Sequence, residues 1–104
     1  MHTIVTARHC EIDERLRERA QSVAERLAAV CDRAMDGAVV FDVDGGKPSA
    51  EIRLNLAGSE SMVARAIGTD HRTALDLAEA KLRRQLERLP RAPRARGRSG
   101  PIVA

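Results

Sequence analysis

Apolar side chains recur along the chain with two different periods, and the changes of period divide it into six segments. From Asp13 to about Ala34, and again from Asp70 to Leu89, they recur every three or four residues, which predicts two amphipathic helices. Before and between these helices, short β-branched, continuously apolar or alternating runs predict strands. The expected strands are residues 2–7, 38–43, 49–56 and 61–67. The expected order is therefore β-α-β-β-β-α.

Residues at the ends of these segments fit the same division. Asp13 and Asp70 each precede a helical pattern and are expected to be N-caps. Gly37 is expected to end the first helix and Pro90 the second. Short glycine turns would join the last three strands into an antiparallel meander. The expected turns are Asp44-Gly45-Gly46 and Gly58-Ser59.

The order of elements predicts an α+β fold with a four-stranded, mostly antiparallel sheet. The first strand crosses over through the first helix, so it should run parallel to the second strand if the two are neighbours. Each helix has a single apolar stripe, so both helices should pack side by side on one face of the sheet. We expect residues 1–89 to form one domain, and residues 90–104, rich in Pro, Gly and Arg, to be a disordered basic tail.

The distribution of charge suggests a polyanionic partner. The net charge of the 104 residues is only +3, but residues 71–104 contain nine basic and three acidic side chains, whereas residues 34–70 contain three basic and six acidic ones. Phe41 is the only aromatic residue, which argues against proteins that stack bases on aromatic platforms. The partner indicated is nucleic acid or an anionic surface, and if it is nucleic acid, we expect the protein to contact its phosphates and its folded shape.

Within each predicted helix, basic and acidic side chains are sorted onto opposite flanks of the apolar stripe. With the helices side by side, we expect the two basic flanks to merge into one cationic surface, a step that assumes a relative rotation of the helices. Arg83 lies nearer Glu79 and Glu87 and is expected to pair within its helix. The candidate residues for binding a polyanion are Lys81, Arg84, Arg88 and Arg91 from the second helix onward, Arg15, Arg19, Arg26 and Arg33 in the first helix region, and Arg8 and Arg65 on or beside strands.

Other chemistry has little support in the sequence. His2, His9 and His71 lack the spacing of metal ligands, and Cys10 and Cys31 fit a loop thiol and a small core residue better than a disulfide. No nucleophile has a visible base and orienting group. We expect no catalytic residue, no metal, no cofactor and no small-molecule substrate, and therefore not an enzyme. No apolar run reaches membrane-spanning length and no signal peptide pattern is visible, so we expect a cytoplasmic protein without a membrane partner.

Several short segments occur together in a characteristic order. They are Glu11-Ile12, Leu16-Arg17-Glu18, Asp32-Arg33, Ala50-Glu51-Ile52-Arg53-Leu54-Asn55-Leu56, Gly58, Asp70, Ala74-Leu75-Asp76, Lys81-Leu82 and Arg84-Gln85-Leu86. In this order, from about Thr3 to Leu89, the chain resembles the ribosome hibernation promoting factor family, which includes ribosome-associated inhibitor A. The chain departs from the family at Arg72 and Cys31, where aromatic residues are common, and in its more acidic first helix.

The resemblance implies a non-enzymatic role on the small ribosomal subunit. Family members bind in the channel that holds mRNA and the decoding-site tRNAs, and they contact ribosomal RNA through basic residues. They stop translation during starvation or stationary phase, and some promote ribosome dimers whereas others prevent them. Long-form members carry a second, dimerising domain. The chain resembles the short form, for which we expect no dedicated dimerisation domain.

Two other functions fit the residues taken by themselves. One is binding of structured RNA unrelated to ribosomes through the same basic flanks. The other is a protein-interaction module in which an acidic sheet edge or helix flank binds a basic partner. The resemblance favours the ribosomal function over both.

Overall fold

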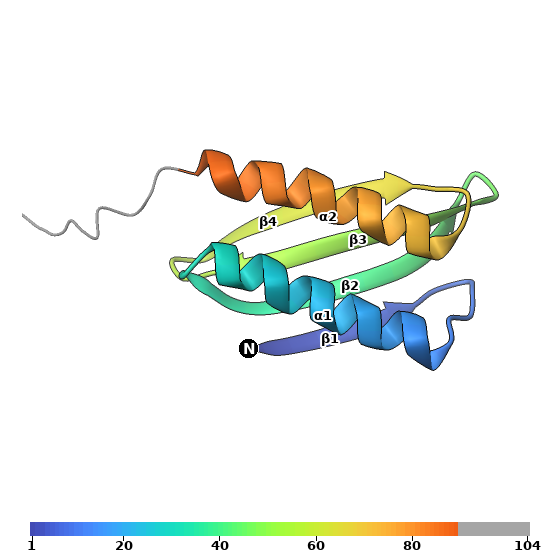
Figure 1. Cartoon of the computed structure of the whole chain (residues 1–104), viewed down its shortest axis with the longest axis horizontal. Coiled ribbons are helices and arrows are strands. Elements are labelled where there is room, and N and C mark those ends of the chain that lie inside the picture. Colours follow the sequence, from blue (N-terminus) through green and yellow to red (C-terminus); the bar gives the residue numbers. More distant parts are fainter. Residues whose placement is uncertain (90–104) are drawn as a thin grey trace, which may run out of the picture.

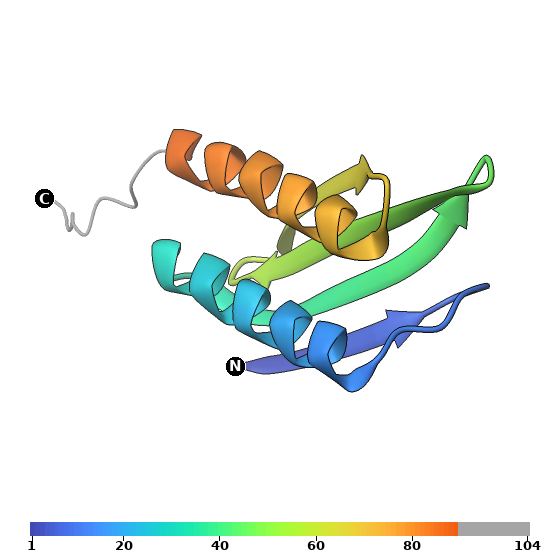
Figure 2. The ribbon, with the colours of Figure 1, turned by 45° about the vertical axis from the view of Figure 1, so that its right-hand side comes forward.

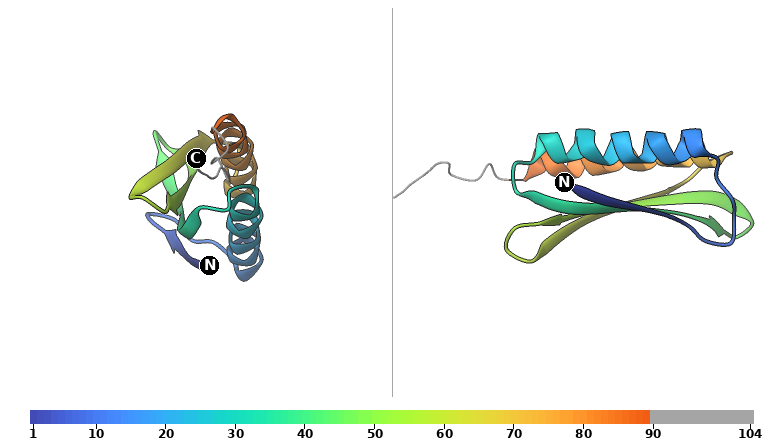
Figure 3. Two further views of the ribbon diagram at one scale, coloured as in Figure 1. Left: turned by 90° about the vertical axis from the view of Figure 1, so that its left-hand side faces the viewer. Right: turned by 90° about the horizontal axis from the view of Figure 1, so that it is seen from below.

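The computed structural model describes residues 1–89 and confirms the predicted order of elements. The strands form one sheet in the order β1-β2-β3-β4, in which β1 is parallel to β2 and the other neighbours are antiparallel (Figure 1). Both helices cover the same face of this sheet (Figure 3). The predicted α+β fold is thus confirmed, and residues 90–104 lie outside the described part. The elements are β1 (His2–Ala7), α1 (Glu14–Val30), β2 (Ala34–Asp44), β3 (Lys47–Leu56), β4 (Glu60–Ile67) and α2 (His71–Arg88).

The boundary between α1 and β2 differs from the prediction. The helix ends at Val30 rather than near Ala34, and Ala34 already begins β2. Gly37, expected to stop the helix, lies inside this strand. A Cβ atom at Gly37 would lie 3.2 Å from Leu54 Cδ2 and 3.3 Å from the carbonyl oxygen of Arg53. Glycine is therefore favoured there by the close approach of the neighbouring strand, not by a helix end.

The predicted caps and turns are confirmed. The carboxylate of Asp13 accepts a hydrogen bond from the backbone N–H of Leu16 at 2.8 Å, and that of Asp70 accepts one from Thr73 at 2.7 Å. Between β2 and β3, Gly45 and Gly46 have φ angles of 60° and 79°, the left-handed conformation that a two-residue hairpin requires. Local sequence therefore determines where these helices begin and where the strands turn.

The hydrophobic core lies between the sheet and the two helices. The alternation predicted for β3 is confirmed, because Ala50, Ile52, Leu54 and Leu56 are all buried on the helix side. Phe41 of β2 is fully buried, and its ring meets the imidazole of His71 edge to face, with centroids 5.8 Å apart. The opposite face of the sheet is covered by neither helix (Figure 3). The core therefore holds both helices on one face.

The two helices run in the same direction. Because β2 is parallel to β1, and β3 and β4 are each antiparallel to the strand before, β1 and β4 point the same way. Each of these two strands is followed by a helix that returns across the sheet. As a result α1 lies over β1 and β2, α2 lies over β3 and β4, and the helices are parallel neighbours (Figures 1 and 2).

Both edge strands direct backbone carbonyl groups away from the sheet. The backbone N–H of Arg8 donates to the carbonyl oxygen of Phe41 in β2. Because backbone groups alternate in direction along a strand, the backbone carbonyl groups of Thr3 and Val5 face away from the sheet. Similarly, the backbone N–H of Gly68 donates to the carbonyl oxygen of Pro48 in β3, so the backbone carbonyl groups of Val63 and Arg65 face away from the sheet. Unpaired edge groups of this kind can pair with another chain unless they are covered.

Polar side chains of the helices cover these outward carbonyl groups in the same way at both edges. In α1, Arg17 donates to the carbonyl oxygen of Val5 at 2.9 Å, and Gln21 donates to that of Thr3 at 3.2 Å. Four residues are one helical turn, so both donors lie on one side of α1. The equivalent pairs at the other edge are Lys81 with Arg65 (2.9 Å) and Gln85 with Val63 (3.2 Å). Each helix is thereby hydrogen-bonded to the edge strand beneath it.

Replacing Arg17 with Met would keep the apolar stem and remove the hydrogen bond to Val5. We expect the free energy of unfolding to fall by about 1–2 kcal/mol, because a partly buried carbonyl oxygen loses a charged donor. Urea denaturation measures this change. Arg15→Met is the matched control, since Arg15 is exposed and has no described partner, and it should change stability by less than about 0.5 kcal/mol. Equal losses in the two variants would contradict the role of Arg17.

Candidate nucleic-acid interface

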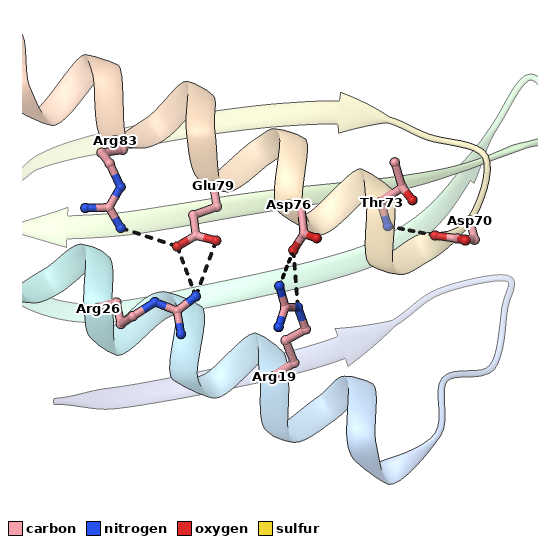
Figure 4. A network of polar contacts seen from close by, with 7 residues as sticks. All are labelled: Arg19, Arg26, Asp70, Thr73, Asp76, Glu79 and Arg83. Carbon is pink, nitrogen blue, oxygen red and sulfur yellow. Dashed lines mark hydrogen bonds and ion pairs between the residues drawn. The ribbon is translucent and has the colours of Figure 1, made fainter.

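The flanks of α1 and α2 that face each other carry opposite charges and form an ion-pair ladder (Figure 4). The guanidinium of Arg19 donates to Asp76 Oδ1 through Nε at 3.2 Å and through a terminal nitrogen at 2.8 Å. The guanidinium of Arg26 lies 3.1 Å from Glu79 Oε2, and Arg83 reaches the same oxygen at 3.3 Å. The intrahelical partner predicted for Arg83 is thus confirmed.

This ladder contradicts the expected merging of the two basic flanks. When each helix is viewed from its N-terminus with the apolar stripe facing the sheet, the basic side chains lie on the same side of the stripe in both helices. Because the helices are parallel, the basic flank of α1 must then face the acidic flank of α2. The expectation was wrong because it considered the apolar stripes without the direction of the helices. In Arg19 and Arg26, positive charge expected to face RNA faces carboxylates instead.

The ladder contributes more to the distribution of charge than to stability. The Arg19 and Asp76 side chains retain 33% and 44% of their exposure, and water weakens ion pairs at such sites. Exposed pairs of this kind are typically worth about 0.2–1 kcal/mol each. Their electrostatic effect is larger, because each nearby carboxylate cancels much of the field that a guanidinium presents to a distant anion.

The outer flank of α2 is the main basic surface that remains. Arg84 and Arg88 are exposed, and within residues 1–89 neither makes an ion pair. Lys81, on the same side, uses one of its three donors on the carbonyl oxygen of Arg65. Arg91, expected to continue this row, lies outside the described residues. The outer flank of α1 carries the exposed acidic residues Glu14, Glu18 and Glu25, so the two long sides of the helical layer have opposite charge.

Three other candidates lie away from the outer flank of α2. Arg33 hydrogen-bonds Glu60 at 2.5 Å, which raises the pKa of Arg33 and joins the loop after α1 to the first residue of β4. Arg65 pairs with Asp44 at 3.0 Å. Arg8 makes no ion pair among the described residues, and with Arg65 it lines a small hollow of about 180 Å³ on the open face of the sheet. The structure therefore does not bring all the predicted residues into one surface.

The helix seam contains one arginine that the sequence analysis did not select. Arg72 and the predicted Arg15 line a hollow between the N-terminal parts of α2 and α1, and neither makes an ion pair within residues 1–89. Arg72 was missed because its helical position places it on the acidic flank of α2. The signal that could have identified it is the expected adjacency of the helices, which brings this flank close to the basic flank of α1.

Residues 1–89 contain neither a cluster of metal ligands nor a membrane-spanning helix. In residues 1–89, no three His, Cys, Asp or Glu side chains converge in a group able to hold a metal ion. Of the two described helices, neither is long and apolar enough to cross a membrane.

His9 Nδ1 lies 3.1 Å from Asp42 Oδ1, and the pKa of Asp42 is lowered by the backbone N–H of Val43 and by this histidine.

Comparison with known proteins identifies one family and a set of similar solved structures. The family model described as Sigma 54 modulation protein / S30EA ribosomal protein matches residues 3–92. A ribosomal subunit interface protein from Coxiella burnetii shares 25% sequence identity at a TM-score of 0.74, with 84% of this chain and 94% of that chain covered. The Protein Y N-terminal domain of Thermus thermophilus shares 27% identity at a TM-score of 0.72, with 85% and 98% covered. No curated protein sequence matches the chain.

The cap of α2 predicts a specific effect of pH on stability. The backbone N–H of Thr73, and then its hydroxyl, lower the pKa of Asp70 below its ordinary value of 3.8. The unfolded chain therefore takes up this proton first, so the stabilising effect is present above pH 3.8 and is lost as the pH falls through the lowered pKa. Asp70→Asn is a suitable comparison, because Asn caps a helix about as well and does not titrate.

In urea denaturation series, we expect the stability of the wild type relative to Asp70→Asn to decrease as the pH is lowered from 6 to below the ordinary pKa of 3.8. Other carboxylates titrate in both proteins and cancel in this difference. A difference that stays constant across the acid range would contradict the cap's contribution.

Proposed function

We propose a function on the premise that the chain belongs to the Sigma 54 modulation protein / S30EA ribosomal protein family. The chain is a ribosome-associated protein that binds ribosomal RNA of the small subunit, in the channel for mRNA and tRNA. By occupying this channel in the cytoplasm, it inhibits translation during starvation or stationary phase. The solved ribosomal subunit interface protein, similar over most of both chains, supports the ribosomal partner.

The observation that carries the proposal is the uncompensated outer flank of α2. Arg84 and Arg88 are exposed one helical turn apart, and no described carboxylate pairs with either. A guanidinium can bind a phosphate through two parallel hydrogen bonds, which makes arginine well suited to an RNA backbone. Lys81 has two further donors for the same row, and Arg91 would extend it beyond the described residues.

The other predicted arginines contribute unequally in this proposal. The positive charges of Arg19, Arg26, Arg33 and Arg65 are compensated by carboxylates, so an RNA phosphate would have to compete with an existing partner. Arg15 makes no ion pair among residues 1–89 and is available for an additional contact. Arg8 makes no ion pair either, but it lines its hollow together with Asp42 and Glu51, and its charge helps to lower the pKa of Asp42.

The mechanism is occupancy, with no bond made or broken. Neutralisation of phosphates by the outer flank of α2 supplies affinity that depends strongly on salt. The fixed shape of the sheet and helices supplies selectivity, because folded RNA is recognised mainly by shape and backbone contacts. The acidic outer flank of α1 repels phosphate and would face away from the RNA, which sets the orientation of the bound protein.

The double variant Arg84→Glu/Arg88→Glu should bind small ribosomal subunits at least ten-fold more weakly, as measured by co-sedimentation. We also expect the slope of log affinity against log salt to become shallower by about one to two units, because one or two phosphate contacts are lost. The matched control is Lys47→Glu/Arg53→Glu, which changes the net charge equally through two exposed residues of β3. The control should bind nearly as well as the wild type.

Two results would reject the proposal. One is recovery of the wild-type protein only in ribosome-free fractions at low salt. The other is competition in which an arbitrary RNA duplex displaces the protein as effectively as small subunits do, because that result indicates a general structured-RNA binder. A translation assay with purified protein, analysed on sucrose gradients, then measures inhibition and ribosome dimers together.

A further inference from the structure

Two open hollows lie between α1 and α2, and both are lined by the same three arginines. One hollow is near the N-terminal ends of the helices and the other lies along their seam, and each has a volume of about 390 Å³. Arg15 and Arg19 come from α1 and Arg72 comes from α2. Arginines from two helices therefore line both hollows.

Arg15 and Arg72 differ from the other arginines on the facing flanks. Arg19, Arg26 and Arg83 each pair with a carboxylate across or along the seam (Figure 4). Arg15 and Arg72 have no ion pair or hydrogen bond within residues 1–89 and are exposed. The ladder residue Arg19 also lines both hollows, but its charge is compensated by Asp76, so Arg15 and Arg72 are the arginines shared by both hollows that make no ion pair within residues 1–89.

Most carboxylates around this end of the seam are already engaged. Asp13 and Asp70 accept hydrogen bonds from the first turns of their own helices, and Asp76 accepts both donors of Arg19. Because these N-caps already occupy helix N–H groups, a bound anion would be held by the guanidiniums rather than by the helix ends. Two exposed carboxylates are not engaged within residues 1–89: Glu11 lines the hollow at the helix ends and Glu18 lines the other.

We propose that Arg15 and Arg72, which line both hollows, form a clamp that binds one phosphodiester group of an RNA backbone there. This inference rests on the proposed function and adds a second contact to the outer flank of α2. Arg72 and Arg84 are twelve residues apart, or about 18 Å along the helix axis, and they lie on opposite flanks of α2. Two contacts placed this way fix both the position of the RNA and its rotation about α2, which a single row of arginines leaves free.

The first experiment observes the two side chains directly in the full chain. A 12-base-pair RNA duplex is titrated into ¹⁵N-labelled protein, and the arginine Nε–H signals are followed by NMR. We expect the signals of Arg15 and Arg72 to shift, while the ladder residue Arg26 shifts less. Unchanged Arg15 and Arg72 signals would overturn the proposal, and so would equal shifts with an acidic peptide at the same charge concentration, because the site would then not select phosphodiesters.

The second experiment measures binding to small ribosomal subunits. Arg15→Gln/Arg72→Gln should lower the affinity about five- to ten-fold and make the salt slope shallower by about one unit, as expected for one lost phosphate contact. Lys47→Gln/Arg53→Gln, with the same change of charge, should leave both quantities unchanged. Thermal unfolding verifies that the variants fold, and because Arg15 and Arg72 make no ion pair or hydrogen bond within residues 1–89, the stability of the variant should stay close to that of the wild type.

The outcomes separate this inference from the proposed function. If the wild type binds subunits and Arg84→Gln/Arg88→Gln weakens binding, but Arg15→Gln/Arg72→Gln does not, the clamp is refuted and the proposed function stands. If the wild type does not bind subunits, the proposed function fails, and the duplex titration alone then supports or refutes the clamp.

Discussion

The contact between α1 and α2 determines how charge is distributed over this protein. Both helices carry basic residues on the same hand, and the sheet makes them parallel, so the guanidiniums of α1 meet the carboxylates of α2. The pairing uses charges that would otherwise add to a large cationic field. What remains is a basic outer flank on α2, an acidic outer flank on α1, and two arginines at the N-terminal end of the seam that make no ion pair within residues 1–89.

The same helices also close the edges of the sheet. Arg17 and Gln21 bind the outward carbonyl groups of β1, and Lys81 and Gln85 bind those of β4. A sheet with four strands and two open edges would otherwise offer two sites for pairing with another chain. These hydrogen bonds and the ladder attach each helix to the strand beneath it and to its neighbour. A scaffold fixed in this way suits recognition by shape, in which the protein has to keep its form while occupying a rigid channel.

The proposed ribosomal function therefore depends on a few uncompensated charges rather than on the total number of arginines. With sixteen arginines and two lysines, the composition suggests a broadly basic protein, yet many of the described arginines have carboxylate or carbonyl partners. Arg84 and Arg88 on one flank of α2, and Arg15 with Arg72 at the seam, can meet phosphate without first losing a partner. Because these two sets of arginines lie at different flanks of α2, together they would fix the orientation of a bound RNA.

The sequence by itself determined the six elements, both N-caps, the glycine turns and the buried face of β3, because periodicity, capping and turn chemistry depend on residues close together in the chain. It also indicated the family, through short segments in a fixed order. Only the tertiary structure decided which flanks of the helices meet, because Arg19 and Asp76 are far apart in the chain and face each other only through the shared direction of the helices. The same holds for Gly37, whose environment is set by β3, and for Lys81, whose ammonium group binds β4. The interaction of two charges depends on their distance in space, and the fold brings together charged groups that are far apart in the sequence.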